Sequence, residues 1–117
     1  MNIACSILKY EILSYSVYIL CNWKHTVFYT GVTNNLVRRV FEHKVKMSKG
    51  FTSQYNCNQL MYYEEFQYIW DVIHREKQIK KYKRDWKKNL ISSMNPDWND
   101  LSDGWYDIRE FEAFKKD

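Results

Sequence analysis

The sequence contains little of what interrupts or staples a chain: one proline, three glycines and three cysteines occur in 117 residues. The cysteines, at positions 5, 21 and 57, form no C-x-x-C pair and lack the spacing of a zinc site. This scarcity excludes collagen-like, linker-like and disulfide-rich proteins. We expect three reduced thiols, no metal cluster built on them, and a cytoplasmic location.

Long apolar runs are also missing. No stretch reaches the roughly 18 uninterrupted apolar residues of a membrane span, so no association with a membrane is expected. Residues 1–14, MNIACSILKYEILS, have no basic segment ahead of their apolar part, which Lys9 and Glu11 interrupt. They therefore make a poor signal peptide.

Apolar and aromatic residues are abundant, at 45% and 18% of the chain. This composition excludes a disordered protein, because enough apolar surface is present to form a core. The length of 117 residues fits a single domain, since domains cluster at roughly 100–150 residues.

The net charge of +4 conceals a strong asymmetry along the chain. Residues 97–117 hold seven acidic and three basic residues, whereas residues 1–96 hold seven acidic and 15 basic ones. Eight of those 15 lie in residues 75–88, REKQIKKYKRDWKK. Such a segment indicates either a phosphate-rich partner or a solvated helix face, and charge alone favours the second.

Two strands are predicted near the start of the chain. Residues 15–22 and 27–32 are rich in β-branched and aromatic side chains, and a short polar turn separates them. Gly31 interrupts the second strand and marks a place where a side chain would be in the way. Residues 33–35, TNN, supply N-cap candidates for a helix over residues 36–46.

The second half of the chain predicts one more strand and further helices. A polar loop over residues 47–58 precedes a strand over residues 59–66. A helical stretch over residues 68–94, with a break near residues 83–85, ends at the Asn-Pro pair, because a residue before proline avoids helical geometry. The order β-β-α-β-α-α predicts an α+β fold in which helices flank a small three-stranded antiparallel sheet.

One carboxylate stands out on the second helical segment. Ile69, Val72, Glu76 and Ile79 follow one another at helical spacing, so Glu76 is expected to face the core or a cleft beside it. A carboxylate in that position needs a partner. Either a salt bridge with a neighbouring basic residue or a functional site would provide it.

Four further side chains form a group with Glu76. Tyr18 and Tyr29 lie on adjacent strands, and Arg39 and His43 are four residues apart on one helix. Taken separately, each type is common in packing or on a surface. Together they supply the parts of metal-assisted phosphodiester hydrolysis: a carboxylate for a divalent ion, a guanidinium for the phosphate, and a phenol or imidazole for the proton of water.

Four segments in order resemble the GIY-YIG nuclease family, in particular its small stand-alone bacterial members. SVY at 16–18 and YTG at 29–31 correspond to the name-giving tripeptides. The other corresponding segments are TNNLVRRVFEHK at 33–44, REKQIKKYKRDWKKNLI at 75–91 and NPDWNDL at 95–101. The resemblance covers about residues 15–101, which we expect to form the nuclease domain.

The resemblance implies a divalent-metal-dependent endonuclease that hydrolyses DNA, in repair or in mobile-element processing. Glu76 would be the single carboxylate ligand of one Mg²⁺ or Mn²⁺, with waters completing the shell. Arg39 would contact the scissile phosphate, and Gly31 is the structural glycine of its motif. The second tripeptide departs from the family at Thr30, which stands in place of isoleucine and is expected to affect packing.

The resemblance does not decide which residue of this sequence is the general base or which asparagine lines the site. Tyr29 would position or deprotonate the attacking water, Tyr18 would support the site by hydrogen bonding, and His43 would share the proton transfer. Tyr29 and His43 are both candidates for the general base. A late asparagine lines the site in some relatives, and Asn95 and Asn99 both compete for that place.

A nucleic-acid interface is expected from the basic residues of the first helix, the loop after it and the later helices. Lysine and arginine side chains there would contact backbone phosphates, which position a protein without reading sequence. They are Lys44, Lys46, Lys49, Lys80, Lys81, Lys83, Arg84, Lys87 and Lys88. Because no sequence-reading module is present, specificity would come from the structure of the nucleic acid or from a protein partner.

Two other function classes compete with the nuclease. One is a nucleic-acid-binding module that has kept the fold with little or no cleavage; the other is a structural or interaction protein. The complete set of two tyrosines, Arg39 and Glu76 favours the enzyme over the first, and the basic segment beside an inward carboxylate disfavours the second.

Residues 1–14 and 102–117 extend beyond the expected domain as an N-terminal extension and an acidic, aromatic tail. Two interpretations stand for the tail. Trp105, Phe111 and Phe114 dock on the domain, or the acidic residues fold over the basic helix and compete with nucleic acid.

Overall fold

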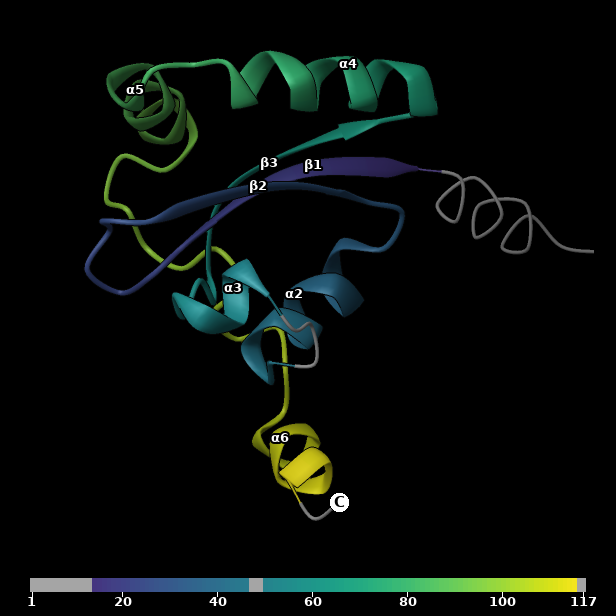
Figure 1. Ribbon diagram of the computed structural model, residues 1–117. Coiled ribbons are helices and arrows are strands. Elements are labelled where there is room, and N and C mark those ends of the chain that lie inside the picture. Colours follow the sequence, from purple (N-terminus) through teal and green to yellow (C-terminus); the bar gives the residue numbers. More distant parts are fainter. Residues whose placement is uncertain (1–13, 47–49, 116–117) are drawn as a thin grey trace, which may run out of the picture.

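The computed structural model describes residues 14–46 and 50–115 (Figure 1). Its elements follow the predicted order β-β-α-β-α-α, with two short helices added. They are β1 (Tyr15–Cys21), β2 (Phe28–Thr33), α2 (Leu36–Lys44), α3 (Phe51–Gln54), β3 (Gln59–Phe66), α4 (Ile69–Lys80), α5 (Arg84–Met94) and α6 (Ile108–Lys115). The predicted α+β class is therefore confirmed, whereas α3 lies in a segment predicted as a loop and α6 lies in the tail.

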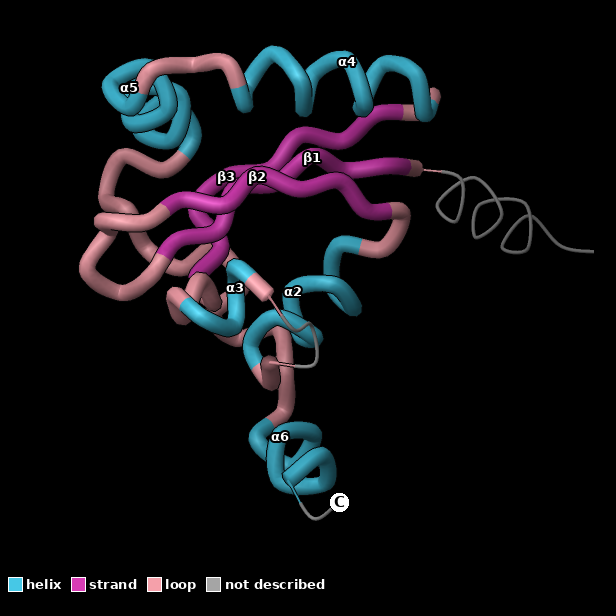
Figure 2. The backbone as a smooth tube through the Cα atoms, viewed as in Figure 1, coloured by secondary structure: helices cyan, strands magenta, loops and turns pink. Residues whose placement is uncertain are grey.

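The three strands form one antiparallel sheet in the order β2-β1-β3, which places β1 at the centre and leaves β2 as an edge. Helices α4 and α5 cover one face, and α2 and α3 lie against the other (Figure 2). Because side chains alternate along a strand, Val17 and Ile19 of β1 point to the first face and Tyr18 and Leu20 to the second.

The α4–α5 face is closed by a largely aliphatic core, which we call the aliphatic face. Val72 and Ile79 of α4 and Ile91 of α5 are fully buried against Val17 and Ile19 of the sheet. The predicted apolar stripe on α4 is thus confirmed at Val72 and Ile79. It is wrong at Ile69, which is 44% exposed because it lies in the first turn of the helix, at its outer end.

The tail docks on the opposite side of the sheet from α4 and α5 (Figure 1). Phe111 and Phe114 of α6 pack against Phe41 of α2, with ring centroids 5.2 and 6.4 Å from that of Phe41. Tyr106 donates a hydrogen bond of 2.7 Å to the carbonyl oxygen of Val37. The aromatic interpretation of the tail therefore describes the structure, and the interpretation that it folds over the basic helix does not.

Two of the three cysteines fall within the described residues. Cys21 and Cys57 are free and buried, as expected for reduced thiols. Cys5 and most of the N-terminal extension lie outside the described residues. In the described part of the chain no helix is both long and apolar enough to cross a membrane.

Candidate active site

The site is organised around Tyr18, whose ring lies over the edge strand. Tyr18 pairs with Gly31 across the β1–β2 ladder. A Cβ atom at position 31 would lie 2.6 Å from the Cζ and hydroxyl oxygen of Tyr18 and 3.0 Å from the ring of Tyr29. Glycine is therefore required at position 31 for the Tyr18 ring to lie there, as the sequence predicted.

His43 lies beneath Tyr18 and is 2% exposed. Its Nε2 is 3.0 Å from the Tyr18 hydroxyl and its Nδ1 is 2.9 Å from the hydroxyl of Thr52 in α3. Burial, assisted by the positive charge of Arg39, lowers the pKa of His43 to about 4. The ring is therefore neutral near pH 7, with one nitrogen donating and the other accepting.

Tyr29 lies between this buried pair and solvent. Its ring centroid is 5.7 Å from that of His43 and 6.3 Å from that of Tyr18. Its outer side stacks on Phe51 of α3, at 6.1 Å. Tyr29 is half-buried, whereas Tyr18 is 1% exposed, so Tyr29 is the phenol that solvent reaches.

Arg39 reaches the same place from α2. Its guanidinium forms an ion pair of 3.0 Å with Glu42, one turn along the helix. Both residues line a small hollow of about 190 Å³ beside the N-terminus of α2. The charge of Arg39 acts on the hydroxyl of Tyr18 and opposes the effect of burial, which raises the pKa of Tyr18 to about 12.

Glu76 approaches from the other layer of the fold. It projects from α4, which packs on β1 and β2, and its side chain is 21% exposed. Its carboxylate forms an ion pair of 3.4 Å with Lys80, and its charge also acts on Tyr18. Glu76 on α4 and Arg39 on α2 therefore both act electrostatically on Tyr18, which pairs with Gly31 of β2.

The donors at this place fit one hard divalent ion held by a single carboxylate. The described residues contain no group of three or more His, Cys, Asp or Glu side chains that could enclose a metal. Mg²⁺ is commonly bound through one or two carboxylates, with waters and substrate phosphates as the remaining ligands. Glu76 suits that mode of binding, because its carboxylate is partly exposed and belongs to no larger group of metal-binding side chains among the described residues.

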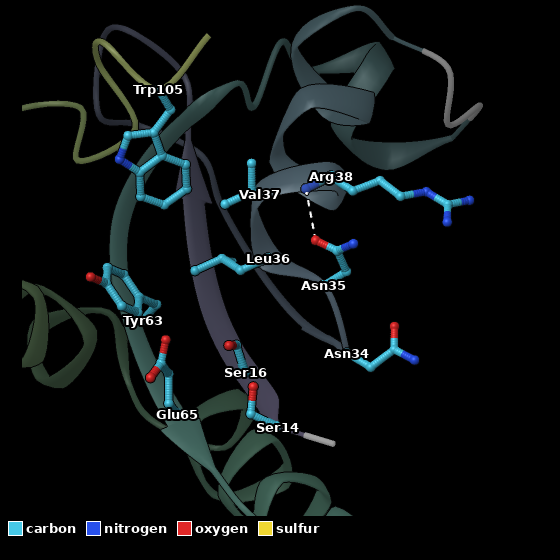
Figure 3. A pocket seen from close by; sticks show the side chains of 10 residues that line it. All are labelled: Ser14, Ser16, Asn34, Asn35, Leu36, Val37, Arg38, Tyr63, Glu65 and Trp105. Atoms are coloured by element: carbon cyan, nitrogen blue, oxygen red, sulfur yellow. Dashed lines mark hydrogen bonds between the residues drawn. The ribbon is translucent and has the colours of Figure 1, made fainter. Parts of the chain in front are cut away.

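A second, larger hollow of about 720 Å³ lies on the other side of the α2 N-terminus. Figure 3 shows Trp105 and Tyr63 along one wall and Leu36 and Val37 along the other, with the side chain of Arg38 pointing away. The lining is mixed: Glu65 and Arg38 are charged, and serine and asparagine side chains complete it. None of the five predicted catalytic and metal-binding residues lines this hollow.

The two candidate asparagines have different positions. Asn95 is 4% exposed and donates hydrogen bonds to the carbonyl oxygens of Met61, at 3.2 Å, and Asn99, at 2.7 Å. Its own oxygen accepts from the backbone N–H of Asn99 at 3.1 Å. The Asn95 side chain therefore ties the end of α5 to β3, while Asn99 takes part through its backbone.

The predicted phosphate-binding residues fall into two groups. Lys46, Lys80, Lys81, Lys83 and Lys88 are exposed and Lys87 is half-buried. The ammonium group of Lys44 is instead held by Asp100 at 2.7 Å and by the Asn58 carbonyl at 2.8 Å, and Arg84 donates to the Thr26 carbonyl at 2.8 Å. Lys49 lies outside the described residues.

Sequence reasoning missed three residues of this site: Thr52, Phe51 and Glu42. Thr52 and Phe51 belong to α3, a single turn that is too short to show helical periodicity. Two signals were available in the sequence. One is Gly50, directly before the turn, where the structure has a φ of 123° that favours glycine. The other is the spacing of three between Arg39 and Glu42.

Comparison with known proteins agrees with the sequence resemblance. The family model described as "GIY-YIG catalytic domain" matches residues 14–89. A UPF0213 protein of Clostridium perfringens is 39% identical over 79 residues, which cover 68% of this chain and 84% of that protein. The solution NMR structure of a UPF0213 protein from Bacillus halodurans has a TM-score of 0.50 at 22% identity and covers 78% of this chain and 97% of its own. That likeness supports the fold.

Proposed function

The chain belongs to the GIY-YIG family, and from that premise we propose that it is a divalent-metal-dependent endonuclease that hydrolyses phosphodiester bonds in DNA. The observation that carries the proposal is the group of side chains around Gly31: the hydroxyl of the buried Tyr18 is hydrogen-bonded to the neutral His43. Tyr29 lies beside this pair, and the charges of Arg39 and Glu76 both act on Tyr18. Guanidinium, carboxylate and phenols at one edge of a sheet are the groups that phosphodiester hydrolysis needs.

Charge stabilisation is assigned to Arg39 and Glu76. Glu76 would hold the divalent ion, which supplies Lewis-acid polarisation of the phosphodiester when bound. Arg39 would stabilise the charge that develops on the non-bridging oxygens, and its ion pair with Glu42 orients the guanidinium before substrate binds. A bound phosphate would also draw Lys80 away from Glu76.

Proton transfer is assigned to Tyr29. His43 cannot reach a water molecule directly, because it is 2% exposed and both ring nitrogens are within hydrogen-bond distance of hydroxyl groups. Tyr18 keeps its proton, since burial raises its pKa to about 12. The half-buried Tyr29 would therefore face the attacking water, with the rings of Tyr18 and His43 packed beside it.

The wider interface is assigned to exposed lysines in three places: the loop after α2, the turn between α4 and α5, and α5 itself. Lys81, Lys83 and Lys88 would contact backbone phosphates, so binding should weaken steeply as salt rises. Lys44 and Arg84 are left out of this interface, because their side chains have partners inside the protein.

The test is cleavage of a panel of labelled DNAs with Mg²⁺ or Mn²⁺. Glu76→Ala and Arg39→Ala should each lower the rate by at least about 10²–10³-fold, the scale at which a single preorganised electrostatic group contributes. Two matched controls should cut normally: Asp71→Ala, which removes an exposed acid from the same helix, and Arg38→Ala, which removes the exposed neighbouring arginine.

The outcomes separate the candidate functions. Cleavage that persists in both site variants would overturn the assignment of the site. Salt-sensitive binding without cleavage of any DNA would instead favour a binding module of the same fold, and cleavage of RNA alone would change the substrate class.

A further inference from the structure

A hollow of about 420 Å³ on the outer side of α4 and α5 has no role in the proposed cleavage reaction. We call it the Trp86 hollow. Its lining consists of His74, Lys77, Gln78, Lys81, Tyr82 and Trp86. Its volume falls within the roughly 300–1,000 Å³ of pockets that hold small organic groups.

The aromatic part of the hollow is open to solvent. Trp86 is 60% exposed, and Tyr82 meets it edge-on with ring centroids 5.5 Å apart. Tyr82 is in turn held by a hydrogen bond of 3.2 Å from Arg75, so the ring that supports the indole is fixed. An indole supported at its edge leaves π-surface free for another flat group.

The rest of the lining is basic. Lys77 lies in the last turn of α4, and Lys81, four residues later, is its C-cap residue in helical geometry, so both side chains project on the same outward face as His74. Neither lysine forms an ion pair within the described part of the chain. Positive charge beside an open indole complements a group that is both anionic and aromatic.

A short path leads from the hollow to the candidate active site. Lys80 forms the 3.4 Å ion pair with Glu76 and lies three residues from Lys77, so the two lysines are neighbours on the helix surface. The basic residues therefore continue around α4 from Glu76 to the Trp86 hollow.

We infer that the Trp86 hollow binds a nucleobase of a single-stranded stretch of the nucleic acid, with its flanking phosphates on Lys77 and Lys81. The inference rests on the proposed nuclease function and specifies its substrate as nucleic acid with a single-stranded extension. Aromatic rings stack on any unpaired base, whereas the bases of a duplex are already stacked on one another and cannot enter the hollow.

Binding is tested in the Glu76→Gln background and in EDTA, so that no cleavage occurs. Fluorescence anisotropy compares a labelled oligothymidine with a duplex of equal length. Trp86→Ala should weaken oligothymidine binding by about tenfold, in line with one stacked base, and leave duplex binding unchanged. Trp86→Phe keeps a ring and should retain most of the affinity.

Trp70 provides the matched control, because it is a 78% exposed tryptophan of α4, the helix that supplies Lys77 to the hollow, and does not itself line the hollow. Trp70→Ala should bind both DNAs as the parent does. Lys77→Ala should flatten the salt dependence of oligothymidine binding, which tests the hollow without altering an aromatic residue or a lysine of the wider interface.

Equal oligothymidine affinity of the parent and Trp86→Ala, or an equal loss in Trp70→Ala, would overturn the inference. An equal loss of single-stranded and duplex binding in Trp86→Ala would overturn it too. Failure of the nuclease proposal is distinct, because it appears as absent cleavage in the metal-dependent assay and leaves these affinities unaffected.

Discussion

On the α4–α5 face of the sheet, Val17 and Ile19 of β1 are fully buried in a core whose fully buried members carry no hydroxyl or ring nitrogen, and aromatic side chains surround it. On the α2–α3 face the intervening Tyr18 is equally buried, but against Tyr29 and His43, and it is hydrogen-bonded. Strand β1 therefore contributes side chains to two hydrophobic cores of different kinds, one on each face of the sheet. The first is held by the volume and shape of its side chains, and the second depends on hydrogen bonds whose loss leaves polar groups buried without partners.

This difference separates stability from most of the proposed chemistry within a small protein; Glu76, on α4, is the exception. A change on the aliphatic face alters the free energy of unfolding and leaves the arrangement of Tyr18, His43 and Thr52 intact. A change on the other face affects both. The four predictions that follow test this separation.

The largest expected effect is on the aliphatic face. Ile91→Ala should lower the free energy of unfolding by about 2–5 kcal/mol, because it opens a cavity in a fully buried site. Urea denaturation measures the loss, and cleavage per folded molecule should not change. Ile108→Ala, at a residue that is 71% exposed, should alter stability by less than about 0.5 kcal/mol. A large loss of cleavage in folded Ile91→Ala would contradict the separation of the two faces.

The next effect is a pH dependence from the polar face. His43 has a pKa of about 4 in the folded protein and about 6.5 in the unfolded chain. Between those values the unfolded chain binds a proton that the folded protein excludes, so stability is full above about pH 6.5 and falls as the pH drops toward 4. The loss should reach up to about 3 kcal/mol.

Denaturation at several pH values isolates this contribution as the difference between the protein and His43→Gln, which cannot titrate. His74→Gln serves as the control, because His74 is exposed. Parallel loss of stability in the protein and in His43→Gln would show that other groups cause the acid sensitivity.

A smaller effect on stability accompanies Gly31→Ala. The new Cβ would lie 2.6 Å from Tyr18, so the ring must move, at a cost of about 1–3 kcal/mol. Because the ring carries a hydrogen bond to His43, cleavage should fall as well. Gly104→Ala is the comparison: its φ of +84° makes alanine unfavourable by about 1 kcal/mol, but no atom lies within 4 Å, so cleavage should be unchanged. Normal cleavage by Gly31→Ala would show that the position of Tyr18 is not critical.

The sequence was sufficient to predict the strands and helices in which apolar residues recur at regular spacing. Strand β3 (Gln59–Phe66) was predicted at its observed bounds, and the three-residue break between α4 and α5 was predicted within about two residues. The position of Glu76 on the inward side of α4 also followed from helical spacing. Helix α3 is a single turn of four residues, too short for apolar residues to recur at helical spacing. It was therefore predicted as a loop, and Thr52 was missed with it.

The surroundings of charged and titratable residues could not be predicted, because their partners are distant in the chain. Arg39 and His43 were both predicted as site residues, but their spacing could not show that α2 turns His43 into the sheet together with Val40 and leaves Arg39 one-third exposed. In the sequence Lys44 resembles any other lysine of the expected nucleic-acid interface, but its partner, Asp100, lies 56 residues away. A sequence shows how many charges are present, and only the fold shows which of them are paired.

The smallest expected effect concerns Thr30, where the family motif has isoleucine. Thr30 pairs with Ile19 in the ladder, so its side chain lies on the aliphatic face, and it is 5% exposed. Its hydroxyl oxygen has no hydrogen-bond partner among the described residues. Thr30→Val should therefore raise the free energy of unfolding by about 1 kcal/mol, because it removes a buried polar group without changing the volume greatly. Cleavage should stay the same, since Thr30 points away from Tyr18. A fall in cleavage with unchanged stability would instead assign the hydroxyl to the site, and the two faces would then meet at the edge strand.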